Sequence, residues 1–346
     1  MIAAAVAAGA GRAGAPVPVR ARAPLPPRPP LTCSACLVMV DDDVLWGREI
    51  DTRRANASTT KMATAVLVVR EAELDEPVTA SRTAAATGGG GLDLRPGDVF
   101  TVEELLHALL LSSSNDAAVA LAEHVAGSEA AFVARMNAFA ETLGLRGSRF
   151  VTSHGLDVPG HYSTARDLAR LALAVLRRPA LAEIVATPET TIGGTSGTHR
   201  LVNTNPLLES YDGAVGVKTG YTSGAGDVLV AAAVRAGRRL VAVAMGSDDA
   251  PADARALLDY GFRILGRGVL VREGRILGAL VFDPSGAAAV VAGRTVRGIP
   301  EPGSVGIRFD PARNVTPPLA AGETVGTVVV SSAQGNVVAR APAVAD

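Results

Sequence analysis

Apolar residues alternate in short runs near the start of the chain, recur with helical spacing through its middle, and form strand-like runs again after it. The first runs, at 33–40 and 44–50, lie on either side of an acidic turn and predict two neighbouring strands. Further runs of this kind predict strands at 214–219, 228–234 and 239–246. The short connection at 235–238 is typical of antiparallel neighbours.

The middle of the chain is predicted to be helical. Apolar residues recur there every three or four positions, and Thr101 and Thr164 have the surroundings of helix caps. Asn56 and Ser58 are predicted to cap the first helix. The predicted helices cover 59–74, 101–111, 116–126, 129–143, 165–176 and 252–265. This order of strands and helices predicts an α+β fold, in which helices pack on both faces of an antiparallel sheet.

The two ends of the chain differ in composition from its middle. Residues 1–30 hold seven of the 21 prolines, which predicts an extended and poorly ordered leader. Its apolar stretch at 2–10 is short and no basic residue precedes it, so this stretch alone leaves export open. Short β runs separated by Gly and Pro predict a small all-β sandwich domain at 268–346, which leaves 31–267 as the main domain.

Composition and charge narrow the function classes. Apolar residues make up 48% of the chain, enough for a sizeable core, and the net charge is −1. That charge gives no electrostatic argument for a nucleic acid or an anionic membrane as partner. No apolar run reaches the roughly 18 residues of a membrane span, so we expect no transmembrane helix. The five histidines are scattered, and we expect neither a metal nor a cofactor.

Cys33 and Cys36 form a CxxC pair, which we interpret as two small buried side chains. Three residues of an extended strand span about 10 Å, too far for an unstrained disulfide. We therefore predict neither a disulfide nor a redox role for the pair.

Lysine is almost absent from the chain. Of the 33 basic residues only Lys61 and Lys218 are lysines, and the others are arginines. A retained lysine indicates a site that needs a compact ammonium or an amine able to lose its proton, because guanidinium supplies neither. The alternative is a codon bias with two chance survivors, so the neighbours of each lysine decide.

Lys61 closes the sequence Ser58-Thr59-Thr60-Lys61. At a helix start, positions three apart lie on one face, so the amine is expected near the Ser58 hydroxyl. A neutral amine there could accept the hydroxyl proton, and burial or a second cation would lower its pKa far enough. The Ser58 backbone N–H could also stabilise an oxyanion. Alone, SxxK is a weak signal.

Two further motifs follow in the chain. Ser113 and Asn115 lie two residues apart at a helix entry, where a hydroxyl and an amide can face one cleft. Lys218-Thr219-Gly220 ends a predicted strand, with a cation and a hydroxyl for a carboxylate and a glycine that permits close approach. Since both lysines of the chain lie in this ordered set, chance is a poor explanation.

The set SxxK, SxN and KTG resembles the signature of the serine penicillin-recognising enzymes. The surrounding residues, among them 57–62, 109–118, 154–157, 160–165 and 216–222, resemble the low-molecular-weight D-alanyl-D-alanine carboxypeptidases. The resemblance runs from about residue 31 to 265 and implies a β-lactamase/transpeptidase-like fold. The terminal β region is similar to the small sandwich domain that follows in that family.

The resemblance implies a role for each motif residue. Ser58 would be the acylated nucleophile, Lys61 its base and Ser113 a proton relay. Asn115 would hold the substrate, Lys218 and Thr219 its terminal carboxylate, and Gly220 would allow close approach. The N–H groups of Ser58 and Tyr221 would form the oxyanion hole.

The reaction implied by the resemblance would be removal of the last D-alanine from peptidoglycan pentapeptide stems through an acyl-serine, with β-lactams as covalent inhibitors. We further expect a monomer in an extracytoplasmic compartment, since the substrate lies there.

Several features depart from the family. Asn56 stands where proline is usual, and 247–254 lack the arginine that often helps to bind the carboxylate. The end of the chain lacks an amphipathic anchor helix, so peripheral attachment through it is not expected.

Two other functions compete. A class A β-lactamase shares the motifs but deacylates with a glutamate, and none occurs between Glu141 and Glu183. A non-catalytic peptidoglycan-binding relative is disfavoured because every motif residue is present. His154 and His161 are predicted to be hydrogen-bonding loop residues, and the glycines at 88–91 a turn.

Overall fold

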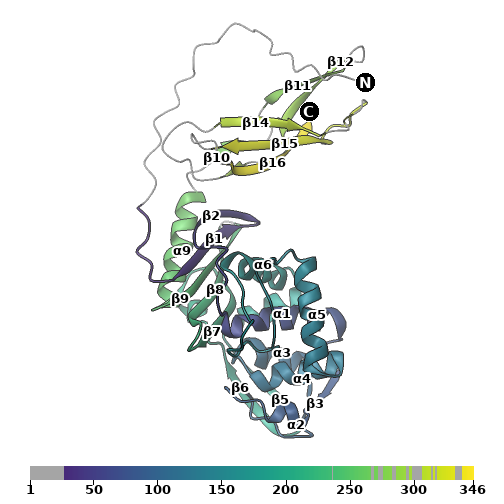
Figure 1. Ribbon diagram of the computed structural model, residues 1–346, viewed down its shortest axis with the longest axis vertical. Coiled ribbons are helices and arrows are strands. Elements are labelled where there is room, and N and C mark those ends of the chain that lie inside the picture. The colour runs from purple at the N-terminus through teal and green to yellow at the C-terminus, as the bar shows by residue number, and fades with distance from the viewer. Residues whose placement is uncertain are drawn as a thin grey trace. The chain divides into compact units, whose positions relative to one another are not determined.

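The computed structural model describes residues 27–235, 237–265, 269–271, 276–282, 286–293, 296–297, 306–312, 315, 318–331 and 337–346. Contacts divide the chain into two compact units, one of which is Arg28–Phe262 while the other includes Arg263–Asp346 (Figure 1). The two units are described separately. The domain limits read from the sequence stay a prediction.

A five-stranded antiparallel sheet forms the centre of the first unit, in the order β2-β1-β9-β8-β7. Its strands are β1 (Ala35–Val40), β2 (Asp43–Arg48), β7 (Ala214–Thr222), β8 (Gly226–Arg235) and β9 (Arg238–Ser247). The first and last strands of this unit thus meet in one sheet, and β7 lies at its edge.

Helices cover both faces of this sheet, as the sequence predicts (Figure 1). Leu37 and Met39 of β1 belong to the core shared with the helices α1 (Lys61–Glu71) and α6 (Ala165–Leu176). Val38 points the other way, because a Cβ built on Gly261 of α9 (Ala250–Leu265) would lie 2.8 Å from it. The strand alternates its side chains, so both faces need a helical cover.

The helices α2, α3 and α5 pack against α4, eight of whose twelve residues are buried, whereas α7 and α8 lie against β7. Thr101 forms a full capping box with Glu104, and Thr164 accepts from the Asp167 N–H, both as predicted. The helices are α2 (Arg82–Ala85), α3 (Val102–Leu110), α4 (Asn115–Ala126), α5 (Glu129–Thr142), α7 (Pro179–Ala186) and α8 (Leu207–Ser210). No single helix of the described chain is long and apolar enough to cross a membrane, and α4 with α5 meets that test only as a pair bent by 83°.

Other local predictions need correction. The first predicted helix starts as a 3-10 turn, η1 (Ala57–Thr60), and the predicted caps do not form. Asn56 precedes this turn without a side-chain cap, while Ser58 lies inside it and Thr60 takes the cap position of α1. The Asn56 amide instead donates to the hydroxyls of Thr59 and Thr60. The strand pair β3/β4, the hairpin β5/β6 and the helices α2, α7 and α8 were not predicted. Their strands are β3 (Pro77–Thr79), β4 (Val99–Thr101), β5 (Glu189–Gly194) and β6 (Gly197–Val202).

After α9, the described residues of the second unit form strands and loops, and this confirms the prediction of an all-β region. One antiparallel sheet has the order β11-β12-β16-β15-β14, and β10 pairs with β13. Buried valines and alanines, such as Val325, Val328 and Ala343, form its described core. The strands are β10 (Val269–Val271), β11 (Ile276–Phe282), β12 (Gly286–Ala292), β13 (Val296–Arg297), β14 (Gly306–Pro311), β15 (Thr324–Ser331) and β16 (Val337–Ala345).

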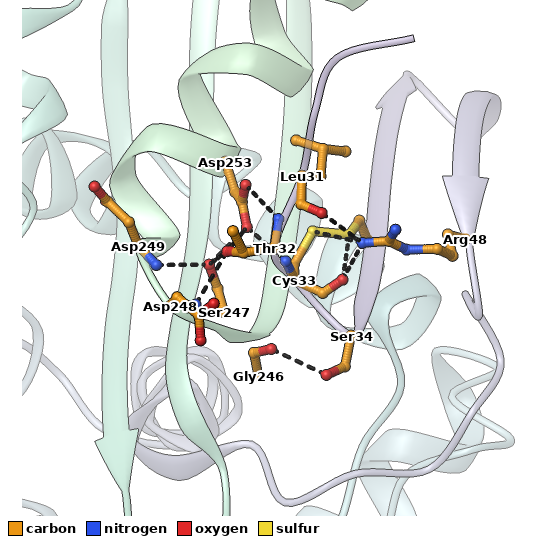
Figure 2. The surroundings of a disulfide bond; sticks show 11 residues. Leu31, Thr32, Cys33, Ser34, Arg48, Gly246, Ser247, Asp248, Asp249 and Asp253 are labelled. Carbon is orange, nitrogen blue, oxygen red and sulfur yellow. Dashed lines mark hydrogen bonds between the residues drawn. A yellow bond between two sulfur atoms is a disulfide. The ribbon is translucent and has the colours of Figure 1, made fainter.

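The prediction that Cys33 and Cys36 stay unpaired is wrong, because they form a disulfide (Figure 2). The strand begins only at Ala35, and a bend at Ser34 brings the two Cα atoms to 6.1 Å, within the range of disulfides. Arg48 of β2 lies against the bond, with its guanidinium 3.6 Å from the Cys36 sulfur.

On the other side of the disulfide, Asp253 of α9 accepts hydrogen bonds from four donors. These are the N–H groups of Thr32 and Cys33 and the hydroxyls of Thr32 and Ser247 (Figure 2). The entry of the chain into the sheet is therefore fastened both to β2 and to α9.

Candidate active site

Ser58 lies in the 3-10 turn η1, directly before α1. The residue before it, Ala57, has φ 46°, a left-handed conformation that an alanine rarely adopts. Such backbone strain persists only where the surroundings hold it, and it is frequent at active sites. Gly155 packs against this turn, since a Cβ built on it would lie 2.0 Å from the Ala57 carbonyl oxygen. The tight turn presents Ser58, half-buried, at the end of the helix that carries Lys61.

The amine of Lys61 is completely buried and has three partners. Its Nζ lies 2.9 Å from Ser58 Oγ, 2.6 Å from Asn115 Oδ1 and 2.9 Å from the His154 carbonyl oxygen. The amide and carbonyl oxygens can only accept hydrogen bonds. A neutral amine has two N–H donors for these oxygens and one lone pair, which is then left for the Ser58 hydroxyl proton.

Electrostatics favour this neutral form. Burial lowers the pKa of Lys61 well below its usual value, and the positive charge of Lys218 lowers it further. The carboxylate of Asp116 acts in the opposite direction. Asp116 is itself occupied, because it accepts from the N–H groups of Leu92 and Leu94.

The glycine run at 88–91 orients Asn115. The Asn115 amide nitrogen donates to the carbonyl oxygens of Gly88 and Gly89, so its oxygen points toward Lys61. Gly89 has φ 84°, and a Cβ there would lie 2.8 Å from the Asn115 amide nitrogen. Both ends of this amide are thus occupied by protein groups. Its predicted role in holding the substrate stays a prediction.

Lys218 lies on the edge strand β7 and is also fully buried, but its only described hydrogen bond goes to the Thr219 carbonyl oxygen, at 3.2 Å. Burial alone lowers the pKa of Lys218 to about 7. No described carboxylate forms an ion pair with it. A buried amine without an anion is a site that a negatively charged ligand would stabilise.

Of the other KTG residues, Gly220 adjoins the nucleophile and Thr219 contacts Thr204. A Cβ built on Gly220 would lie 2.9 Å from the Ser58 backbone nitrogen, so glycine is needed for the approach of β7 to η1. The Thr219 hydroxyl is 2.5 Å from that of Thr204, which follows β6. Tyr221, the next residue along, has 69% of its surface exposed.

Ser113 has a left-handed φ of 66°, and its buried hydroxyl has no hydrogen-bond partner among the described residues. The structure therefore joins Ser58, Lys61 and Asn115 by direct contacts and adds Lys218 through its charge and Gly220 through its packing. Ser113 and Tyr221 form no described hydrogen bond with these residues, and Thr219 forms one only through its backbone carbonyl oxygen, which accepts from the Lys218 amine.

A loop at 153–157 supplies contacts that sequence reasoning did not assign. The His154 carbonyl oxygen binds Lys61, while Asp157 accepts from the Thr222 hydroxyl and the Gly224 N–H and so fixes the end of β7. The resemblance of residues 154–157 to the carboxypeptidase family indicates that this loop matters. It does not indicate the contact itself, because a backbone carbonyl group has no sequence signature. His161 accepts from the Val151 N–H, contacts the Thr60 hydroxyl, and has a pKa lowered to about 4 by burial.

Within the described part of the chain, no group of three or more His, Cys, Asp or Glu side chains is arranged to hold a metal ion. The chemistry available at this site is that of a hydroxyl activated by a buried amine.

Comparisons with known proteins agree with this geometry. A family model described as D-alanyl-D-alanine carboxypeptidase matches residues 28–249. The chain is similar to the D-alanyl-D-alanine carboxypeptidase DacF of Bacillus subtilis, with 37% identity over 239 residues, which cover 66% of this chain and 61% of that protein. The chain thus spans less than two thirds of the length of this relative.

Solved structures show the same likeness. The crystal structure of the Streptomyces K15 DD-transpeptidase is 32% identical, with a TM-score of 0.65, and the match covers 68% of this chain and 98% of that one. The crystal structure of the D-alanyl-D-alanine carboxypeptidase DacD from Francisella tularensis has a TM-score of 0.73 at 24% identity and covers 92% of this chain and 94% of that one. At that identity the match shows a shared fold, and it extends beyond residues 28–249.

Proposed function

This chain belongs to the D-alanyl-D-alanine carboxypeptidase family, and we propose that it is a serine-type carboxypeptidase that removes the terminal D-alanine from peptidoglycan pentapeptide stems. The observation that carries the proposal is the contact of the buried Lys61 amine with Ser58 Oγ, at 2.9 Å. A nucleophile and its base at this distance are the arrangement required for covalent acyl transfer.

Acylation begins when Ser58 Oγ attacks the carbonyl carbon of the bond between the two terminal residues. The hydroxyl proton passes to Lys61 Nζ, and a negative charge develops on the carbonyl oxygen. When the tetrahedral intermediate collapses, the C–N bond breaks and the leaving amine takes up a proton. Ser113, whose hydroxyl is buried beside the start of α4, is the proposed relay for this proton.

Deacylation releases the shortened peptide. A water molecule adds to the acyl-serine carbonyl, the ester bond breaks, and the Ser58 hydroxyl is restored. β-Lactams would form the same ester with Ser58, so acylation by penicillin is expected of this enzyme.

Binding groups surround this centre. We assign the terminal carboxylate to Lys218 and Thr219, because Lys218 is buried without an anion. The N–H groups of Ser58 and Tyr221 would hold the oxyanion, and removal of one such donor typically costs about 3 kcal/mol of barrier. Asn115 would orient Lys61, since both ends of its amide are already bound.

The disulfide supports an extracytoplasmic location. Disulfides persist in oxidising compartments and are rare in the cytosol, and the proposed substrate lies outside the cytoplasm. We further propose that the protein acts as a monomer.

The test is D-alanine release from a pentapeptide ending in D-Ala-D-Ala, with Ser58→Ala as the control. Steady release by the natural protein and none by the variant are expected. Fluorescent penicillin should label the natural protein alone, whereas absence of label would favour a non-catalytic relative. Rapid repeated turnover of nitrocefin without D-alanine release would instead indicate a β-lactamase.

A further inference from the structure

Tyr221 differs from the other three tyrosines of the chain. Tyr211 and Tyr260 are buried, with a hydroxyl bound to Asp259 in the first case and a ring packed on Trp46 in the second. Tyr162 has the guanidinium of Arg53 over its ring, 4.8 Å from the centroid. The Tyr221 side chain is 69% exposed and has no described ring contact or hydrogen bond.

An exposed aromatic ring is unusual for this chain. Only 3% of its residues are aromatic, and of its described large apolar side chains only Tyr221 and Val202 are exposed. An exposed ring gives up the favourable burial that its area would otherwise provide, and tyrosine, with an apolar ring and a polar hydroxyl, is enriched at binding surfaces.

The register of β7 places this ring relative to the site. Lys218, Gly220 and Thr222 are two positions apart and share one face of the strand. On this face Gly220 packs on the Ser58 backbone and Thr222 binds Asp157. Thr219 and Tyr221 share the opposite face, because side chains alternate along a strand. They are about 6.6 Å apart along the strand, and no described strand pairs with β7 on the side away from β8.

The leaving residue is confined between these two positions. Its carboxylate lies at Lys218 and Thr219, and the carbonyl that precedes it lies at the Tyr221 N–H, so the residue follows the free edge of β7. This placement rests on the proposed function. The side chain of the leaving residue then lies beside the ring of Tyr221.

We propose that the side chain of Tyr221 is a specificity-determining residue for the leaving amino acid. The ring forms an apolar wall that packs against a small side chain such as the methyl group of D-alanine and blocks larger ones. The backbone N–H of the same residue keeps its separate role at the oxyanion, and substitution of the side chain leaves that N–H in place.

The experiment compares peptides that end in D-Ala-Gly, D-Ala-D-Ala and D-Ala-D-Leu, measured as kcat/KM for release of the last residue. The natural protein should prefer D-Ala to Gly by about fourfold, the factor expected for burial of one methyl group. In Tyr221→Ala this ratio should fall to near one, and release of D-Leu should improve about tenfold relative to D-Ala. Tyr221→Phe should keep the natural ratios.

Val202→Ala is the matched control, because Val202 is the other exposed apolar side chain but lies on β6 rather than beside the oxyanion N–H. It should leave all three ratios unchanged. Ratios unchanged within twofold in Tyr221→Ala, or altered equally in Tyr221→Phe, would overturn the inference. Tyr221→Ser gives the same comparison if the alanine variant is unstable, and penicillin labelling of Ser58 reports an intact site. If the natural protein releases no residue from any peptide, the proposed function itself fails.

Discussion

The surroundings of Lys61 and of Lys218 are alike in burial and opposite in hydrogen bonding. Both amines are inaccessible to solvent, and burial lowers the pKa of both. Lys61 has three oxygen partners, two of which can only accept. Lys218 has a single, longer contact with a carbonyl oxygen of its neighbour.

This difference fits the two roles proposed for the lysines, a base at Lys61 and a carboxylate-binding cation at Lys218. The hydrogen bonds of the Lys61 amine are all formed without substrate, which suits a base that must be aligned before the reaction begins. The Lys218 amine has donors left without a described partner, which suits a cation that binds an anionic group of the substrate. Burial alone does not separate a base from a binding group, whereas the count of hydrogen-bond partners does.

The strongest test of this contrast exchanges each lysine for arginine. In Lys61→Arg, acylation of Ser58 by fluorescent penicillin should fall by about 10³-fold or more, because guanidinium keeps the charge but cannot take a proton. In Lys218→Arg a cation and its donors remain, so D-alanine release should be reduced but measurable. Near-normal acylation in Lys61→Arg would contradict the assignment of the base.

A smaller effect should follow when only the alignment of Lys61 is disturbed. Gly89 and Gly90 both have positive φ, but a Cβ on Gly89 would meet the Asn115 amide, while one on Gly90 meets nothing within 4 Å. Gly89→Ala and Gly90→Ala should each cost about 1 kcal/mol of stability from backbone strain. Only Gly89→Ala should also slow penicillin acylation, by about tenfold.

The matched pair separates the two causes. Equal acylation rates in the two variants, measured under conditions where both are folded, would show that the glycine run does not orient Asn115. Thermal unfolding of each variant supplies the control for strain.

The sequence predicts the parts of this site that depend on side-chain identity and local spacing. The i, i+3 relation of Ser58 and Lys61 survives a change from α-helix to 3-10 turn, because both bring such positions together. The helix caps at Thr101 and Thr164 are local patterns too. The antiparallel order of β8 and β9 follows from a short connection.

Features that depend on long-range packing or on backbone groups could not be predicted. The His154 carbonyl that binds Lys61 is 93 residues away and is independent of side-chain type. The sequence does not predict the disulfide, because the strand-like run starts at Cys33, whereas the chain bends at Ser34, where hydrogen bonds to β9 and α9 hold it. The hairpin β5/β6 is rich in Gly and Thr, with few apolar positions to mark it.

The smallest expected effect is on the pH dependence of protein stability, which tests whether Lys218 lacks an anionic partner in the folded protein. The pKa of Lys218 is about 7 in the folded protein and about 10.4 in an unfolded chain. Between these values the unfolded state binds more protons, so the stability of the natural protein should rise with pH over this interval and be lowest below pH 7.

Lys218→Met removes this titration while Lys61 stays in both proteins. The variant should therefore gain a few degrees more in Tm over the natural protein at pH 6 than at pH 9. An equal gain in Tm at both pH values would mean that Lys218 keeps its charge in the folded protein, held by an anion. Lys218 would then have its partners before the substrate arrives, as Lys61 does.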